Sequence, residues 1–455
     1  MTSSCHRLRL AVGASLGFLA LVGCSSAPPQ KAEGGNDADL ALYRTVLDRV
    51  RASYVDSVSE GNLVANSLKG MLTGLDPHSD YMSESEYQEM LDDSQGEFAG
   101  IGAELTREDG RPKIIAPIDD TPAARAGIRS GDVILRIDGK VTDGMNLKDV
   151  VDALRGEVGS TVHITIGRRD QKPFDVTLTR AVIRVASVKW KLEPGHIGYA
   201  RISDFAEKTQ QELLAAIDGL TRGAGGKLDG FVLDLRNDPG GLLDESVRVA
   251  SDFLDGGTVV STRGRENDDD RVYHAPPGND RLKGAPMVVL INGASASASE
   301  IVAGALQDRQ RAVIVGTRSF GKGSVQTIIP LDGHGALRLT TARYYTPSGR
   351  SIQEQGIAPD VRVLLPKDEQ TAEEDVIHES DLRGALNNRG PGESGAAASS
   401  MASAKSGEAD GEEAEGTIDP TLIGTSRDYQ LSRALAELHE MMEHPTARAQ
   451  LSGNR

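Results

Sequence analysis

Cysteine is almost absent from this chain of 455 residues, which contains only Cys5 and Cys24. Because Cys5 lies within an expected export signal, the mature chain would have no pair of cysteines to form a disulfide. An exported protein without disulfides must be stabilised by its hydrophobic cores alone. Two or three domains are expected, because a single core seldom serves a chain of this length.

Basic residues are also scarce relative to acids, with 50 Lys and Arg against 67 Asp and Glu and a net charge of −17. Phosphate binding requires a basic face, so this balance argues against a nucleic-acid partner. Part of the excess acid is local, since residues 367–419 are rich in Asp and Glu. The folded domains are therefore expected to lie closer to neutrality.

The N-terminal hydrophobic run, "LAVGASLGFLALV" (10–22), has 13 residues and is too short to span a bilayer comfortably. Two arginines precede it, and this order predicts an export signal over residues 1–23. The run ends in "LVGC", which resembles the lipobox of bacterial lipoproteins and implies lipid attachment at Cys24. A plain secretory signal is the alternative. Residues 24–38 are then expected to form a flexible, lipid-anchored tether.

Apolar residues recur at helical spacing after the tether, and we expect an N-terminal helical region over residues 39–95. The stripe is formed by Leu40, Tyr43, Leu47, Val50 and Tyr54. Such a stripe is more often part of a core than of an interface. A helical pair ahead of the main domains would also suit dimerisation.

Short strands replace the helical pattern over residues 96–185, where "VILRIDG" and "VHITIG" alternate apolar and polar residues. The segment "TPAARAGIRSGDVILRIDG" (121–139) and the glycine loop before it resemble PDZ domains, which bind peptide C-termini as an added strand. A small β domain with a glycine turn is the structural alternative. The resemblance implies that the terminal carboxylate binds the backbone of Ala99, Gly100, Ile101 and Gly102.

Strands and helices alternate over residues 186–365, which predicts an α/β layer with buried and mostly parallel strands. Residues 366–420 are acidic and rich in Ala, Ser and Gly, with little to bury, so a disordered linker is expected. Residues 421–455 contain "DYQLSRALAELHEMM", which predicts one last amphipathic helix.

A run of alternating serines, "SASASEIVAGAL" (295–306), has two interpretations. Ser297 and Glu300 form an S-x-x-E capping box ahead of an apolar helix. A strand that leads through small residues into a helix also exposes a nucleophile, with the next amide at the positive end of the helix. The spacing alone leaves both interpretations open.

The segment "GTRSFGKGS" (316–324) nearly matches a P-loop, but Gly323 stands where the metal-binding hydroxyl belongs. The β-branched residues that follow disfavour a helix N-terminus facing a phosphate, which weakens an NTPase interpretation. The remaining feature is a lysine between two glycines. Glycines allow the backbone to approach closely, so that the lysine side chain can point into a site.

The segment "DLRNDPGG" (234–241) follows a predicted strand, where ligand sites of open α/β sheets lie. An ordinary β-to-α connection is the alternative. Serine and lysine can act as a catalytic pair without histidine, provided that burial keeps the lysine neutral. The chain has neither H-E-x-x-H nor G-x-S-x-G, which argues against zinc-dependent and histidine-dependent hydrolysis.

In their order along the chain, these motifs resemble the carboxyl-terminal processing peptidases, also called tail-specific proteases. The resemblance also rests on the segments "LDPHSDYM" (75–82), "SFGKGSVQT" (319–327) and "LTTARYYTPSGRSIQEQGIAPD" (339–360). The resemblance implies an α/β peptidase core of the crotonase/ClpP-like type, with an inserted small β-rich PDZ domain and N-terminal helices.

The same resemblance implies a serine endopeptidase. Ser297 would be the nucleophile, Lys322 the general base and Gln326 the assisting amide. The oxyanion would bind the amide of Ala298 and that of a glycine in "PGG", with the choice between Gly240 and Gly241 left open. No metal and no organic cofactor are implied. The alternative is a non-catalytic PDZ scaffold, and the presence of all three catalytic residue types argues against it.

The implied substrates are proteins or peptides with free C-termini, with PDZ binding gating the activity. Together with Cys24, the resemblance implies a periplasmic lipoprotein anchored to a bacterial membrane, and Ser25 weakly favours the outer one. An adaptor or activator protein and a homo-oligomer are both compatible with this interpretation.

Two local features bear on the site. Ala294 precedes Ser295 where many family members have glycine, a change that could alter the turn ahead of the nucleophile. Lys322 and Gln326 would lie about 13 Å apart on an extended strand. Because the glycines of "GKGSVQ" permit a turn, we expect one that brings the two side chains together.

Overall fold

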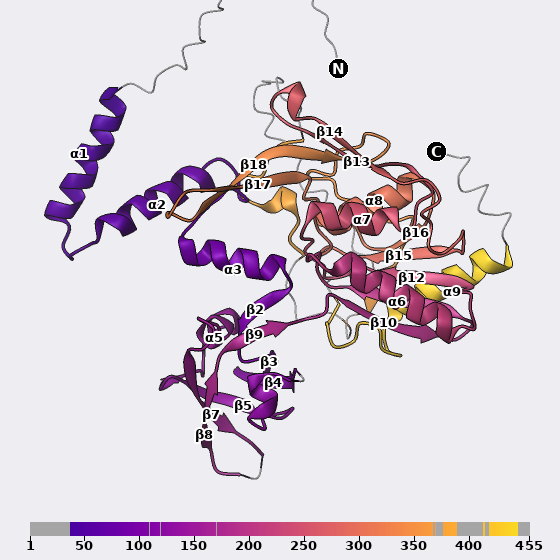
Figure 1. Ribbon diagram of the computed structural model, residues 1–455, viewed down its shortest axis with the longest axis horizontal. Coiled ribbons are helices and arrows are strands. Elements are labelled where there is room, and N and C mark those ends of the chain that lie inside the picture. Colours follow the sequence, from indigo (N-terminus) through magenta and orange to yellow (C-terminus); the bar gives the residue numbers. More distant parts are fainter. Residues whose placement is uncertain are drawn as a thin grey trace, which may run out of the picture. The chain divides into compact units, whose positions relative to one another are not determined.

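The computed structural model describes residues 37–108, 110–118, 120–169, 171–366, 369, 376–388, 413–414 and 418–444 (Figure 1). The expected signal peptide and the lipidation site at Cys24 lie outside the described residues. The chain divides into two compact units, with the boundary after Val64. Among the described residues, no helix combines the length and the apolar character that a membrane crossing requires.

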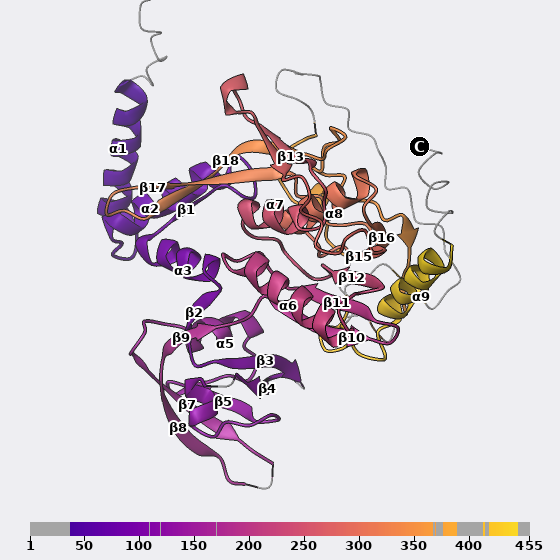
Figure 2. The same ribbon diagram turned by 45° about the vertical axis from the view of Figure 1, so that its right-hand side comes forward.

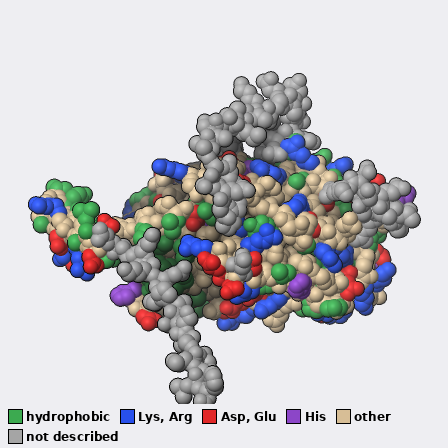
Figure 3. All heavy atoms as spheres, turned by 90° about the horizontal axis from the view of Figure 1, so that it is seen from above, with side chains coloured by type: hydrophobic (Ala, Val, Ile, Leu, Met, Phe, Trp, Pro, Cys, Tyr) green, Lys and Arg blue, Asp and Glu red, His purple; other side chains and the backbone are tan. Residues whose placement is uncertain are grey.

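The first unit contains helix α1 (Asp37–Ser53) and the beginning of helix α2 (Glu60–Thr73). None of the residues of α1 is buried, and hydrophobic and charged side chains share its surface (Figure 3). The predicted stripe is therefore not part of a core in this unit: Leu40 is 61% and Tyr54 58% exposed. Arg51 and Glu60 form an ion pair at 2.7 Å.

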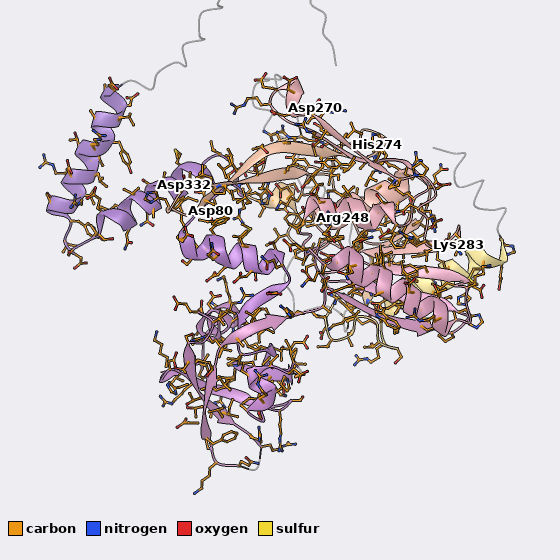
Figure 4. All side chains as sticks on the ribbon, in the orientation of Figure 1. Asp80, Arg248, Asp270, His274, Lys283 and Asp332 are labelled. Atoms are coloured by element: carbon orange, nitrogen blue, oxygen red, sulfur yellow. The ribbon has the colours of Figure 1, made fainter. Side chains whose placement is uncertain are left out.

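The second unit begins within α2 and continues into strand β1 (Asp80–Met82) and helix α3 (Glu84–Ser94). Helix α3 starts with a complete capping box, in which the side chains of Ser83 and Glu86 each accept from the other's amide. Asp80 of β1, labelled in Figure 4, forms an ion pair at 3.8 Å with Arg338 of the peptidase region.

The expected PDZ region forms a six-stranded sheet with the order β3-β4-β5-β7-β8, in which β6 pairs with β5. The strands are β3 (Ala103–Glu108), β4 (Arg111–Pro117), β5 (Val133–Ile137), β6 (Lys140–Val141), β7 (Thr161–Gly167) and β8 (Phe174–Thr179). Two helices accompany them, α4 (Pro122–Arg125) and α5 (Leu147–Leu154). The expected alternation is confirmed in β7, where every second residue is buried.

Strands β2 (Glu97–Gly100) and β9 (Ala181–Arg184) pair antiparallel and bring the two ends of this region together. Because β1 belongs to the sheet of the peptidase region and β10 (Val188–Glu193) follows β9, the PDZ region is an insertion in the sequence of the larger domain.

The central sheet of the peptidase region has six strands in the order β10-β11-β12-β15-β16-β19. The strands after β10 are β11 (Ile197–Ile202), β12 (Gly230–Asp234), β15 (Met287–Ile291), β16 (Val313–Gly316) and β19 (Val361–Arg362). They pair parallel to one another, and only β10 is antiparallel. Every residue of β12 and β15 is buried, as expected for strands covered on both faces.

Helices cover both faces of this sheet (Figure 2). One face packs against α6 (Thr209–Gly223), α7 (Leu243–Ser251) and α8 (Ala298–Asp308). The other face packs against α9 (Tyr429–Glu443), where Leu438 fills the space above Gly230. The α/β layer predicted from the alternation is therefore confirmed.

A second sheet has the order β1-β18-β13-β14, and β17 pairs with β18. Its strands are β13 (Gly257–Arg263), β14 (Arg271–Ala275), β17 (Ser324–Pro330) and β18 (Ala336–Tyr345). The hairpin of β17 and β18 leads away from the candidate lysine and contacts the "LDPHSDYM" segment through β1.

Parts of the expected linker, residues 366–420, are among the described residues. Residues 376–388 are described and include the 3-10 helix η3 (Glu379–Asp381), and the Glu379 side chain is fully buried. The short strands β20 (Leu365–Pro366) and β21 (Glu413–Ala414) also pair. Hydrogen bonds to other parts of the chain engage this segment, since Glu379 N donates to Phe320 O and Gln353 Nε2 donates to Glu379 Oε1.

Candidate active site

Ser297 lies at the tip of the turn between β15 and α8 and is 7% exposed. Its φ of 55° and ψ of −109° are rare for a residue with a side chain, and such strain is concentrated at functional sites. The neighbouring serines have structural roles, since Ser295 Oγ donates to Leu235 O and Ser299 Oγ donates to Asp238 O. The Ser297 hydroxyl instead faces the Tyr344 side chain.

Tyr344 is buried beside the candidate nucleophile. Burial raises the pKa of Tyr344 to about 12, and a hydrogen bond with the Ser297 side chain opposes that rise. The phenol is therefore neutral at physiological pH. Ala294, which departs from the family pattern, does not have a positive φ and adds no backbone strain to the turn.

Glu300 joins the serine turn to the lysine loop. Its fully buried carboxylate accepts from Ser297 N at 2.8 Å and from Lys322 N at 2.9 Å, both on the same oxygen. The other oxygen accepts from Gly321 N at 2.7 Å and Ser319 Oγ at 2.5 Å. Burial raises the pKa of Glu300 to about 7, against the opposing effect of these four donors. The sequence indicated only its role in the capping box.

Lys322 follows the irregular segment 319–321 and is mostly buried. Burial is the main cause that lowers the pKa of its amine below the usual value, and the nearby guanidinium of Arg338 adds to the shift. The carboxylates of Glu379, Glu300 and Asp76 act in the opposite direction. A lysine with a lowered pKa is suited to accept a proton.

The expected contact between Lys322 and Gln326 is not formed. Gln326 lies in β17 beside a bulge, and its Nε2 donates to Ser324 Oγ at 3.0 Å and Thr340 Oγ1 at 3.1 Å. Lys322 lies outside the strands, but β17 begins at Ser324 and directs the Gln326 amide toward β18 instead. Within the described part of the chain, the Lys322 amine has no hydrogen bond to Ser297 or Gln326.

The lysine loop does not resemble a phosphate cradle in its hydrogen bonding. The amides of Gly321 and Lys322 donate to Glu300, and the amide of Gly323 donates to Gln353 Oε1 at 3.0 Å. Because these three donors are engaged within the protein, the loop offers no row of free amides to a nucleotide.

Gly240 lies directly against the candidate nucleophile. A Cβ at this position would come within 2.8 Å of Ser297 Cβ and 2.9 Å of Ala298 N, so only glycine fits. Gly241 instead packs against the backbone of Phe205. Of the two glycines, Gly240 therefore lies beside the Ala298 amide, although its own amide donates to Asp238 Oδ1 at 2.8 Å.

Asp238 is a fully buried acid that the sequence did not single out. Its Oδ1 accepts from Gly240 N, whereas its Oδ2 has no hydrogen-bond partner among the described residues. Burial raises the pKa of Asp238 well above the usual value. The carboxyl is therefore expected to retain its proton well above the pH at which an exposed aspartate ionises.

Arg236 anchors the same loop to the C-terminal helix. Its fully buried guanidinium binds Asp234 and also binds both carboxylate oxygens of Asp428 at 2.9 and 2.6 Å. Asp428 caps α9 by accepting from Leu431 N. No spacing rule connects the arginine with a partner 192 residues away, so the sequence did not indicate this pair.

Of the predicted carboxylate loop of the PDZ region, Ala99 and Gly100 are the last residues of β2, and Ile101 and Gly102 connect β2 to β3. Ile101 O accepts from Ala123 N, and Gly102 O accepts from Ile118 N and Thr121 Oγ1. Gly102 has a φ of 75°, and a Cβ there would lie 2.3 Å from Thr121 Cβ. The loop carbonyls are thus fixed against the start of α4.

Comparisons with known proteins agree with this arrangement. The profile of Peptidase family S41 matches residues 196–363, and that of a PDZ domain matches residues 113–168. A carboxy-terminal-processing protease of Bartonella bacilliformis is 51% identical over 348 residues, which cover 76% of this chain and 80% of its own. The carboxy-terminal processing protease CtpA of Bacillus subtilis is 34% identical over 357 residues, covering 78% and 76%.

Among solved structures, the photosystem II D1 C-terminal processing protease is 31% identical, covers 72% of this chain and 93% of its own, and has a TM-score of 0.43. An α/β core that carries a serine at a strained helix start, with a PDZ domain inserted before it, defines a PDZ-containing serine peptidase. The chain belongs to the carboxy-terminal processing proteases of peptidase family S41. The family resemblance stated from the sequence is thereby confirmed.

Proposed function

We propose that Ser297 and Lys322 form the catalytic pair of this protease, which cleaves proteins recognised through their C-terminal tails. The observation that carries this proposal is the shared Glu300 oxygen, which binds the backbone of both residues across two separate loops. The lowered pKa of Lys322 and the strained backbone of Ser297 support the same assignment.

In the proposed mechanism, the neutral Lys322 amine takes the proton of Ser297 Oγ as this oxygen attacks the scissile carbonyl. The amides of Ala298 and the Gly240 turn stabilise the oxyanion that forms. Lys322 then gives the proton to the leaving amine, and the scissile C–N bond breaks. Water, deprotonated by Lys322, hydrolyses the acyl-enzyme and releases Ser297.

We further propose that the described arrangement is a resting one. The Lys322 amine is not hydrogen-bonded to Ser297, Gln326 donates to β18, and the Gly240 amide donates to Asp238. Activation would turn the Gln326 amide toward Lys322 and free the Gly240 amide for the oxyanion. Binding of a substrate tail to the PDZ domain would favour this change, which gates activity.

We also propose that the protein is a periplasmic lipoprotein anchored through Cys24. The hydrophobic run and the "LVGC" sequence support this location. Metabolic labelling with a fatty acid tests it. Label should enter the wild-type protein and be lost in Cys24→Ala, and a wild-type protein that stays unlabelled would exclude the anchor.

Cleavage assays test the catalytic pair. An unfolded protein with different C-terminal tails is incubated with wild type, Ser297→Ala and Lys322→Ala, and with Ser130→Ala and Lys227→Ala as controls at exposed positions. We expect both pair variants to lose at least about 1,000-fold in kcat. The controls should retain full activity.

Other outcomes discriminate between the alternatives. Equal cleavage by wild type and both pair variants would exclude the proposed residues. A wild-type protein that binds C-terminal peptides but cleaves none of the tailed substrates would instead indicate a non-catalytic PDZ scaffold.

A further inference from the structure

We infer that the segment 376–388, here called the strap, is part of the catalytic machinery, with Glu379 as the positioning residue of the Lys322 loop. This inference rests on the proposed role of Lys322. The strap lies in the acidic region that composition assigns to a linker, and its contacts are with both catalytic loops.

Glu379 is held at three points. Its amide donates to Phe320 O at 3.0 Å, its Oε1 accepts from Gln353 Nε2 at 2.8 Å, and its Oε2 pairs with His78 Nε2 at 2.8 Å. The side chain is fully buried, and a buried carboxylate engaged in this way makes a rigid contact.

These contacts bracket Lys322 on both sides. Phe320, whose carbonyl accepts from Glu379 N, lies two residues before Lys322. Gln353, which donates to Glu379, in turn accepts from the amide of Gly323, the residue directly after Lys322. A Cβ on Gly323 would lie 2.3 Å from Gln353 N, so the loop and the Gln353 backbone are in close contact. Glu379 therefore fixes the position of the Lys322 backbone, from which the lysine side chain extends.

The strap also contacts the loop that leads to Ser297. A Cβ on Gly293 would lie 2.3 Å from Val376 Cγ1 and 3.6 Å from His378 Cε1. The lysine loop is joined to the same turn, since Phe320 N donates to Ser295 O at 3.0 Å. One segment thus sets the relative position of the nucleophile turn and the base.

Charge gives Glu379 an effect that packing alone would not have. The charged groups that face Lys322 are Arg338 from β18, Asp76 after α2, Glu300 from α8 and Glu379 from the strap. The Glu379 carboxylate favours the ammonium form of Lys322. Removing its charge should lower the pKa of Lys322, because one of the three opposing carboxylates is lost.

The test uses the full-length protein and the variants Glu379→Gln and Glu379→Asp, with Glu89→Gln on the exposed face of α3 as the matched control. In Glu379→Gln we expect kcat to fall about tenfold, the effect of one charged hydrogen bond, and the acidic limb of kcat/KM to move to lower pH. Glu379→Asp keeps the charge, so its limb should stay in place. Glu89→Gln should match wild type in both.

A second measurement does not depend on catalysis. The rate at which acetic anhydride acetylates Lys322, compared with exposed Lys227 by mass spectrometry across pH, reports the pKa of the Lys322 amine. A lower pKa of the Lys322 amine in Glu379→Gln supports the inference. Activity in Ser297→Ala would overturn only the proposed function and would leave this result standing. An unchanged pKa with an unchanged pH limb in Glu379→Gln would overturn the inference, as would a folded variant with wild-type kcat.

Discussion

At the scale of single residues, buried carboxyl groups organise this site. Glu300 binds the backbone of both Ser297 and Lys322 through one side chain, and Asp238 accepts from the amide of Gly240. Both acids are fully buried, which raises the pKa of each, yet Glu300 has four donors while one Asp238 oxygen has no hydrogen-bond partner among the described residues. Ionisation of Asp238 therefore destabilises the folded state more than ionisation of Glu300 does.

Asp238→Asn tests that cost. An acid with a raised pKa remains protonated in the folded state where it ionises in the unfolded chain, so its contribution to stability declines as pH rises above about 4. Asparagine does not ionise and retains the oxygen that accepts from Gly240. We therefore expect the free energy of unfolding of the variant, relative to wild type, to increase between pH 5 and pH 8 in urea titrations.

The outcome that contradicts this prediction is equally simple to recognise. A difference between variant and wild type that is the same at both pH values would mean that Asp238 does not titrate differently in the two states. Asp255→Asn, at an exposed acid of the same domain, controls for general charge effects.

At the scale of elements, the C-terminal helix α9 stabilises a loop that is remote in sequence. The two carboxylates of Asp234 and Asp428 bind the buried Arg236 guanidinium, and Gln430 adds a further acceptor at 3.2 Å. Leu438 and its neighbours cover the sheet face opposite α8. Helix α9 is thus a structural part of the peptidase domain rather than a tail.

Asp428→Ala should be strongly destabilising. It leaves part of a buried guanidinium unpaired and removes the cap of α9, and breaking a buried ion pair typically costs about 3–5 kcal/mol. Because Asp234 remains as a partner, we expect about 3 kcal/mol in chemical denaturation. Glu440→Ala, at an exposed position on the same helix, should change stability by less than about 0.5 kcal/mol. A loss in Asp428→Ala as small as that would refute the anchoring role.

At the scale of the whole molecule, a PDZ domain is inserted into a peptidase domain, and each has its own hydrophobic core. Their combination accounts for a protease that acts on proteins with free C-termini. If the PDZ domain selects the tail, damage confined to it should change recognition and leave the catalytic site intact.

Gly102→Ala provides such damage, and Gly110→Ala is its matched control. Both glycines have a φ near 75°, but a Cβ at Gly102 would clash with Thr121 whereas one at Gly110 meets nothing within 4 Å. We expect Gly102→Ala to raise KM for tailed substrates about tenfold or more relative to Gly110→Ala. Cleavage of a substrate with an amidated C-terminus should be equal in the two variants, and equal KM values for the free tail would exclude the loop from recognition.

The sequence by itself determined the features that depend on local order. Periodicity and small residues were sufficient to predict the α/β core, a region of short strands, the serine run before α8 and a lysine between glycines, whereas the PDZ domain was identified by resemblance. Each of these depends on neighbours within a few positions, and periodicity reports such neighbours directly. The family resemblance then assigned roles to those positions.

Only the tertiary structure decided which distant groups meet. It paired Arg236 with Asp428, directed Gln326 toward Thr340 rather than Lys322, and placed Glu379 from an apparent linker against the loop of Lys322. Buried hydrogen bonds between residues far apart in the chain leave no spacing pattern, because chain folding rather than local geometry brings the partners together. The proposed Ser–Lys pair was thus suggested by the sequence, whereas the groups that contact its two loops became visible only in the fold.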